Sequence, residues 1–213
     1  VKVDMKTDEI KHSIGQGDVG IDIGVSTIAY SSNADVKILE LADKVQDIEN
    51  EKRRLLRKMD RSLRATNPDN YNENGTIKKQ GCKKVVWNKS NHYIKYQNRL
   101  KELYRKQADV RKYQHECLAN QIVSLGNNIY VETMNFSGLA KKSTKTEQND
   151  KGRYKRKKRF GKSIANRAPA MLLEIIDRKL SYYGKHLIKI DTWSAKASQF
   201  NHFDGTYKKK SLS

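Results

Sequence analysis

The period of the hydrophobic pattern changes along the chain, and this change limits the folds that the chain can adopt. In residues 19–24 apolar Val and Ile alternate with Gly and Asp, which is the pattern of a strand with one covered face. Two further β-rich runs, 26–30 and 36–41, are separated by a polar turn sequence. We therefore expect a three-stranded antiparallel meander at the start of the domain.

The next segments have a helical period. Residues 42–64 carry apolar side chains at near-helical spacing among charged ones, and Pro68 biases Asn67 out of the α region and ends the helix. A second, longer helix is expected at about 89–125, ending at Gly126. Together these segments form a helical-hairpin insertion at about 43–125.

Strand period returns after the hairpin. Residues 129–132 form a short strand, a helix is expected over 164–183 with Pro169 near its first turn, and 187–190 form a last strand. Three antiparallel strands followed by β-α-β units are the order of an α/β, RNase H-like (RuvC) fold with a helical insertion. We expect residues 17–213 to form this domain, incomplete at its C-terminus, and residues 1–16 to be the trailing edge of a preceding domain.

Charge indicates the class of partner. The chain of 213 residues has 44 Lys and Arg against 24 Asp and Glu, a net charge of +20 that attracts polyanions, nucleic acid first. No apolar run approaches the roughly 20 residues that span a bilayer, so no membrane partner is expected. Cys82 and Cys117 are 35 residues apart and predict neither a disulfide framework nor a zinc site. We expect both to be reduced thiols, and the protein to be cytoplasmic and nucleoid-associated.

Two carboxylates are candidates for chemistry. Asp22 interrupts an apolar strand, where a charge is costly unless it is paired, hydrogen-bonded or metal-bound; an Asp on the solvent face of an edge strand explains the pattern equally well. Glu132 ends a second strand, and a salt bridge with one of the many lysines is the alternative there. Carboxylates at neighbouring strand ends suit two-metal phosphodiester cleavage with Mg²⁺.

The chain resembles a known family at these two positions. Gly20-Ile21-Asp22-Ile23-Gly24 and, about 110 residues later, Ile129-Tyr130-Val131-Glu132-Thr133-Met134-Asn135 resemble the first and second RuvC motifs of the TnpB/OrfB proteins of insertion-sequence transposons. The helical hairpin between the motifs is similar, as is Asn166-Arg167-Ala168 at the start of the following helix. The resemblance runs from Asp18 to the C-terminus.

The resemblance implies an RNA-guided DNA endonuclease that binds guide RNA and target DNA. Asp22 and Glu132 would be catalytic residues and two of three ligands of Mg²⁺ (or Mn²⁺). The third motif has no counterpart, since neither Asp191 nor Asp204 lies late enough, so this piece alone is expected to be inactive. Residues 194–199 lack the cysteine that would begin a zinc ribbon, and no zinc is expected.

Basic segments are candidates for nucleic-acid contact. Residues 141–162 hold eleven Lys and Arg, and an aromatic ring beside the densest run could stack on a base; a solvated loop is the alternative. The expected first helix is also basic, although charge there could mark only its wet face. The candidate residues are Arg53, Arg54, Arg57, Arg153, Tyr154, Lys155, Arg156, Lys157, Lys158, Arg159 and Arg167.

Three other functions remain open at this stage. A transposase or junction resolvase could use the same fold, although the hairpin of roughly 85 residues argues against a compact resolvase. A nuclease-dead, RNA-guided DNA-binding protein would keep the basic surface and lose a carboxylate. A generic basic RNA-binding protein would leave the Asp22 strand unexplained.

Overall fold

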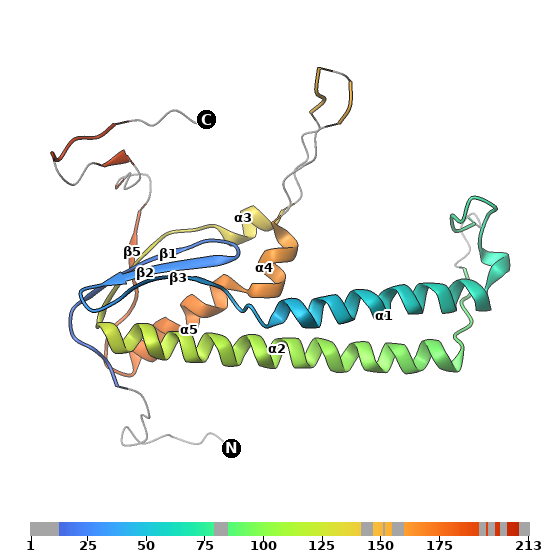
Figure 1. Cartoon of the computed structure of the whole chain (residues 1–213), viewed down its shortest axis with the longest axis horizontal. Coiled ribbons are helices and arrows are strands. Elements are labelled where there is room, and N and C mark those ends of the chain that lie inside the picture. Colours follow the sequence, from blue (N-terminus) through green and yellow to red (C-terminus); the bar gives the residue numbers. More distant parts are fainter. Residues whose placement is uncertain are drawn as a thin grey trace. The chain divides into compact units, whose positions relative to one another are not determined.

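A computed structural model describes residues 13–78, 85–141, 147–150, 152–154, 160–191, 195, 199–200 and 204–208 (Figure 1). The chain divides into two compact units. The first comprises residues 1–41 and 114–213, and the second comprises residues 42–113.

The first unit contains a five-stranded mixed sheet. The order of its strands is β3-β2-β1-β4-β5. β2 pairs antiparallel with both β1 and β3, whereas β4 pairs parallel with both β1 and β5. The predicted three-stranded meander and the α/β class are therefore confirmed. The strands are β1 (Asp18–Ile23), β2 (Thr27–Ser32), β3 (Val36–Glu40), β4 (Asn128–Glu132) and β5 (Ile188–Ile190).

One face of this sheet is covered by helices. Every second residue of β1 and β4 is buried, and these side chains pack against α5 (Pro169–Ser181) and the last turns of α2 (Asn91–Leu125). The buried helical side chains on this face are Ala119, Ile122, Val123, Leu172, Ile175, Ile176 and Leu180. The part of α2 that follows residue 113 therefore belongs to the sheet unit.

Gly126 lets the end of α2 approach the start of β1. A Cβ at this position would lie 2.5 Å from the carbonyl oxygen of Gly17 and 2.8 Å from Val19 Cγ2. The same Gly17 oxygen accepts hydrogen bonds from the amides of Asn127 and Asn128, at 3.0 and 3.1 Å. Gly126 is required here because a side chain would prevent this close packing.

The helix expected over 164–183 is in fact two helices. α4 (Gly161–Arg167) ends at Ala168, which has a positive φ of 46°, and α5 begins at Pro169. Pro169 has no N–H to donate into a preceding turn, so it begins a new helix and does not continue α4. The expectation that Asn166-Arg167-Ala168 begins a helix was wrong, because these residues end one. A short helix, α3 (Phe136–Ala140), was not predicted.

The second unit is a helical hairpin. α1 (Val45–Thr66) and the first turns of α2 share a small apolar core of Ile48, Leu55, Met59, Leu100 and Leu103. As predicted, α1 ends just before Pro68, which begins the 3₁₀ turn η2 (Pro68–Asn70).

Asn67 fixes the tip of the hairpin. Its side-chain amide donates to the carbonyls of Leu63 and Asn88, both at 2.8 Å, and its oxygen accepts from the Asn88 amide at 2.8 Å. Asn67 is buried, so these bonds hold together segments that are 21 residues apart in the sequence.

Among the helices within the described ranges, none has the length and hydropathy needed to cross a membrane.

Candidate metal-binding carboxylates on the open face of the sheet

The strand register places Asp22 beside Glu132. β1 and β4 are parallel, and their last paired residues are Ile21 and Val131. Asp22 and Glu132 are the next residues on each strand. Since neighbouring strands lie about 4.8 Å apart, the two carboxylates project from adjacent positions although 110 residues separate them in the sequence.

Both side chains lie on the face of the sheet opposite the helical core. Ile21 and Val131 are buried, whereas Asp22 is exposed and Glu132 is partly exposed, as strand alternation requires. β1 is the middle strand of the five, so Asp22 is not on an edge strand. The sequence pattern left the position of this strand open, and the topology decides it.

The space around Asp22 is open. Ala29 pairs with Asp22 across β2, and Ile190 pairs with Glu132 across β5. At Gly20, two residues before Asp22 on the same face, an added Cβ would meet no described atom within 4 Å. Asp22 is therefore accessible from this face of the sheet, beside the small residues Gly20 and Ala29.

The turn after β1 is anchored by α4. Ser163 Oγ donates to the carbonyl of Val25 at 2.9 Å, and the Gly24 amide donates to the Thr27 carbonyl at 2.8 Å. These bonds fix the chain immediately after Asp22. Nothing in the sequence pattern indicated Ser163, because this contact joins residues that are 138 positions apart.

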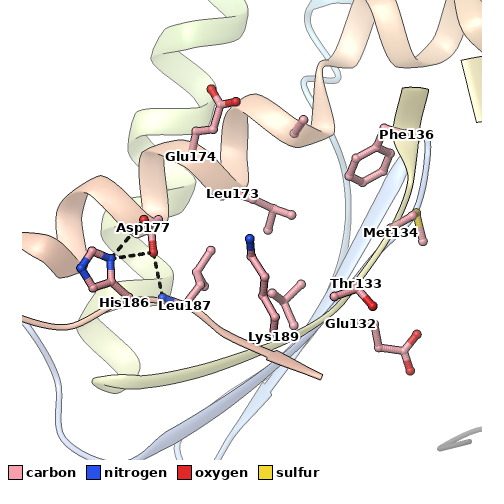
Figure 2. Close-up of a pocket in the computed structure, with 12 residues that line it drawn as sticks. Glu132, Thr133, Met134, Phe136, Leu173, Glu174, Asp177, His186, Leu187 and Lys189 are labelled. Carbon is pink, nitrogen blue, oxygen red and sulfur yellow. Dashed lines mark hydrogen bonds and ion pairs between the residues drawn. The ribbon is translucent and has the colours of Figure 1, made fainter. Parts of the chain in front are cut away.

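A cavity of about 630 Å³ is lined by residues of β4, β5 and α5, and Glu132 lies at its border (Figure 2). There Asp177 accepts a hydrogen bond from the Leu187 amide at 2.9 Å and contacts His186 Nδ1 at 3.3 Å. Figure 2 shows the Glu132 carboxylate directed away from this pair. Asp177 therefore fixes the start of β5 and does not extend the Asp22–Glu132 pair.

The pair offers the hard oxygen ligands that Mg²⁺ and Mn²⁺ prefer. Within the described ranges, no group of three or more His, Cys, Asp or Glu side chains is arranged to hold a metal ion. Asp22 and Glu132 thus fit two ligand positions of a metal site, and the described residues supply no third carboxylate to it.

The predicted nucleic-acid residues fall in three settings. Arg53, Arg54 and Arg57 are exposed on α1, where Arg53 pairs with Glu49 at 3.5 Å. Arg153 and Tyr154 are exposed and follow a turn in which the Arg153 amide donates to the Asn149 side chain. The run Lys155–Arg159 lies outside the described residues.

Arg167 is held within the protein. Its guanidinium pairs with Glu40, with only 15% of the side chain exposed, and it also donates to Ser163 Oγ at 3.4 Å. Its carbonyl oxygen lies 2.7 Å from Nε2 of the buried His115. These contacts join α4 to β3 and α2, and a nucleic-acid role for Arg167 stays a prediction.

Comparison of the chain with protein-family models and with curated proteins found no match in either.

Proposed function

We propose that this chain forms the nuclease core of a TnpB-type protein, a transposon-associated, RNA-guided DNA endonuclease that cleaves phosphodiester bonds with Mg²⁺. The observation that carries the proposal is the placement of Asp22 beside Glu132 on the open face of the central strands. These are the two positions that resemble the RuvC motifs.

The sheet topology supports the proposal. The order β3-β2-β1-β4-β5, with three antiparallel strands followed by two parallel ones, is the order expected of an RNase H-like fold. Carboxylates near the ends of the first and fourth strands lie side by side in that arrangement. The fold supplies the adjacency, and the residue types supply the metal chemistry.

In this proposal Asp22 and Glu132 hold Mg²⁺, and further ligands complete the site. The bound metal would activate water and stabilise the leaving oxygen of the phosphodiester. The chain's own contribution is to fix the two carboxylates through the β1–β4 pairing and the Ser163–Val25 bond, so that little ordering remains when the metal binds.

The excess of basic residues supports nucleic acid as the substrate and guide. A net charge of +20 concentrates polyanions near the surface without reading their sequence. In a guided nuclease that is sufficient, because base pairing between guide RNA and target strand reads the sequence.

The test uses Asp22→Asn with Asp18→Asn as its matched control. Both residues are on β1, on the same face, and both changes remove one negative charge. The intact gene product, expressed with the RNA encoded beside its gene, is assayed for Mg²⁺-dependent cleavage of guide-matched DNA. Mn²⁺ binding to the chain is measured separately by electron paramagnetic resonance.

We expect Asp22→Asn to abolish cleavage and weaken Mn²⁺ binding, while Asp18→Asn retains both. Equal effects of the two variants would refute a specific metal site at Asp22. Guided DNA binding without cleavage by the wild-type protein would favour the nuclease-dead alternative.

A further inference from the structure

A basic pocket in the second unit is not used by the proposed nuclease site. It has a volume of about 370 Å³ and lies between the last turns of α1 and the first turns of α2. Its lining residues are Lys58, Arg61, Ser62, His92 and Tyr96, which we call the basic-aromatic pocket.

The charge of this pocket is not neutralised by its own lining. Lys58 and Arg61 are exposed on α1, and none of the described residues that line the pocket is acidic. The nearest carboxylate in sequence, Asp60, instead pairs with Arg64 at 2.9 Å. Two neighbouring cations without a carboxylate suit a phosphate group.

The start of α2 adds to this potential. Ser90 caps the helix, accepting a hydrogen bond from the Tyr93 amide, and its hydroxyl also lies 2.8 Å from that of Ser62 in the pocket. The first turn of this 35-residue helix contains no acidic residue. The partial positive charge of the helix N-terminus therefore reinforces the cations of the pocket.

Aromatic rings form the other part of the lining. The His92 and Tyr96 rings lie 6.4 Å apart at an interplanar angle of 32°, and Lys58 Nζ lies 5.7 Å from the Tyr96 ring centroid. Bases of single-stranded nucleic acid stack on such rings, whereas in a duplex each base is already stacked between its neighbours. The volume is near the lower end of the range for small-ligand sites and fits one nucleotide.

We propose that the basic-aromatic pocket binds one nucleotide of single-stranded nucleic acid, with the phosphate at Lys58 and Arg61 and the base on the Tyr96 ring. The helical unit then contributes a contact to an unpaired strand that does not depend on its sequence. The inference adds this contact to the proposed function and does not require cleavage.

The test measures the ratio of affinities for two labelled oligonucleotides, in the absence of divalent metal. One is oligo(dT) of about twelve nucleotides, and the other is an abasic strand of the same length. Fluorescence anisotropy with the full chain gives both affinities. The wild type should prefer oligo(dT) by about tenfold, since stacking contributes about 1–3 kcal/mol per base.

Tyr96→Leu should bring this ratio close to one, while Tyr96→Phe, which keeps the ring, should retain it. Lys58→Gln with Arg61→Gln should weaken binding of both strands and reduce the salt dependence of binding by about 0.7 per lost phosphate contact. The matched control is Lys101→Gln with Arg105→Gln, which removes one Lys and one Arg from the same unit outside the pocket. It should leave the oligo(dT) preference unchanged.

Circular dichroism checks the helical content of each variant. Tyr96 packs against the hairpin core, so His92→Ala, at an exposed position, provides a second test if Tyr96→Leu does not fold. It should reduce the ratio severalfold. A folded Tyr96→Leu or His92→Ala variant with the wild-type ratio, or a wild type without oligo(dT) preference, would overturn the proposal. Because no metal is present, either result leaves the test of Asp22 unaffected.

Discussion

Lys52 is the residue whose replacement most directly tests how the hairpin is held together. It lies on α1 with only 5% of its surface exposed. Its ammonium group donates to Gln107 Oε1 at 2.8 Å and to Glu49 Oε2 at 3.1 Å, and it lies 3.9 Å from the centre of the Tyr104 ring. The contact with Gln107 joins residues that are 55 positions apart, across the two helices.

Lys52→Met keeps the length of the side chain and removes its charge. Glu49 is also only 5% exposed, so its carboxylate would stay buried after losing the Lys52 ammonium, with Arg53 at 3.5 Å. Removing one member of a buried pair costs about 3–5 kcal/mol. Because the half-exposed Arg53 offsets part of this, we expect the free energy of unfolding of the hairpin to fall by about 3 kcal/mol.

Urea denaturation followed by circular dichroism measures this change. Lys58→Met is the matched control: it makes the same substitution at an exposed position of α1 and should change stability by less than about 0.5 kcal/mol. Adding Glu49→Leu to Lys52→Met removes the buried carboxylate that has lost Lys52 and should recover most of the loss. A loss below about 1 kcal/mol for Lys52→Met, or a double variant no more stable than the single one, would refute this reasoning.

Two further predictions concern the sheet unit. Gly126→Ala places a Cβ 2.5 Å from the Gly17 carbonyl oxygen, so the end of α2 must shift away from β1. We expect the melting temperature to fall by several degrees. An unchanged melting temperature would contradict the close approach. Burial raises the pKa of Glu116, but hydrogen bonds from Lys179 and Arg178 outweigh it and the pKa is lowered. A lowered pKa in the folded state stabilises the fold above the unfolded pKa of about 4.3, and this stabilisation is lost as pH falls through the folded value. Glu116→Gln should therefore be less stable than wild type near neutral pH and lose less stability on acidification; parallel pH profiles of the urea midpoint would contradict this.

The sequence determined much of the local structure of the chain, although not the break between α4 and α5 or the short helix α3. Alternation in residues 19–24 predicted both the strand and which of its side chains are buried, and helical spacing predicted the two helices of the hairpin. Pro68 marked the end of the first helix. These features depend on neighbouring residues, whose periodicity and backbone preferences are visible without a tertiary structure.

Only the tertiary structure decided which distant residues meet. Strand alternation gave the face of Asp22 but not the position of its strand in the sheet, and the parallel pairing with β4 brought Glu132 beside it. The sequence left open whether the charge on the first helix marked only its wet face, and the packing of α1 on α2 buries two of its charged residues, Glu49 and Lys52. The pairing of strands and the burial of charged helical side chains depend on contacts between segments far apart in the sequence, and no local pattern encodes such contacts.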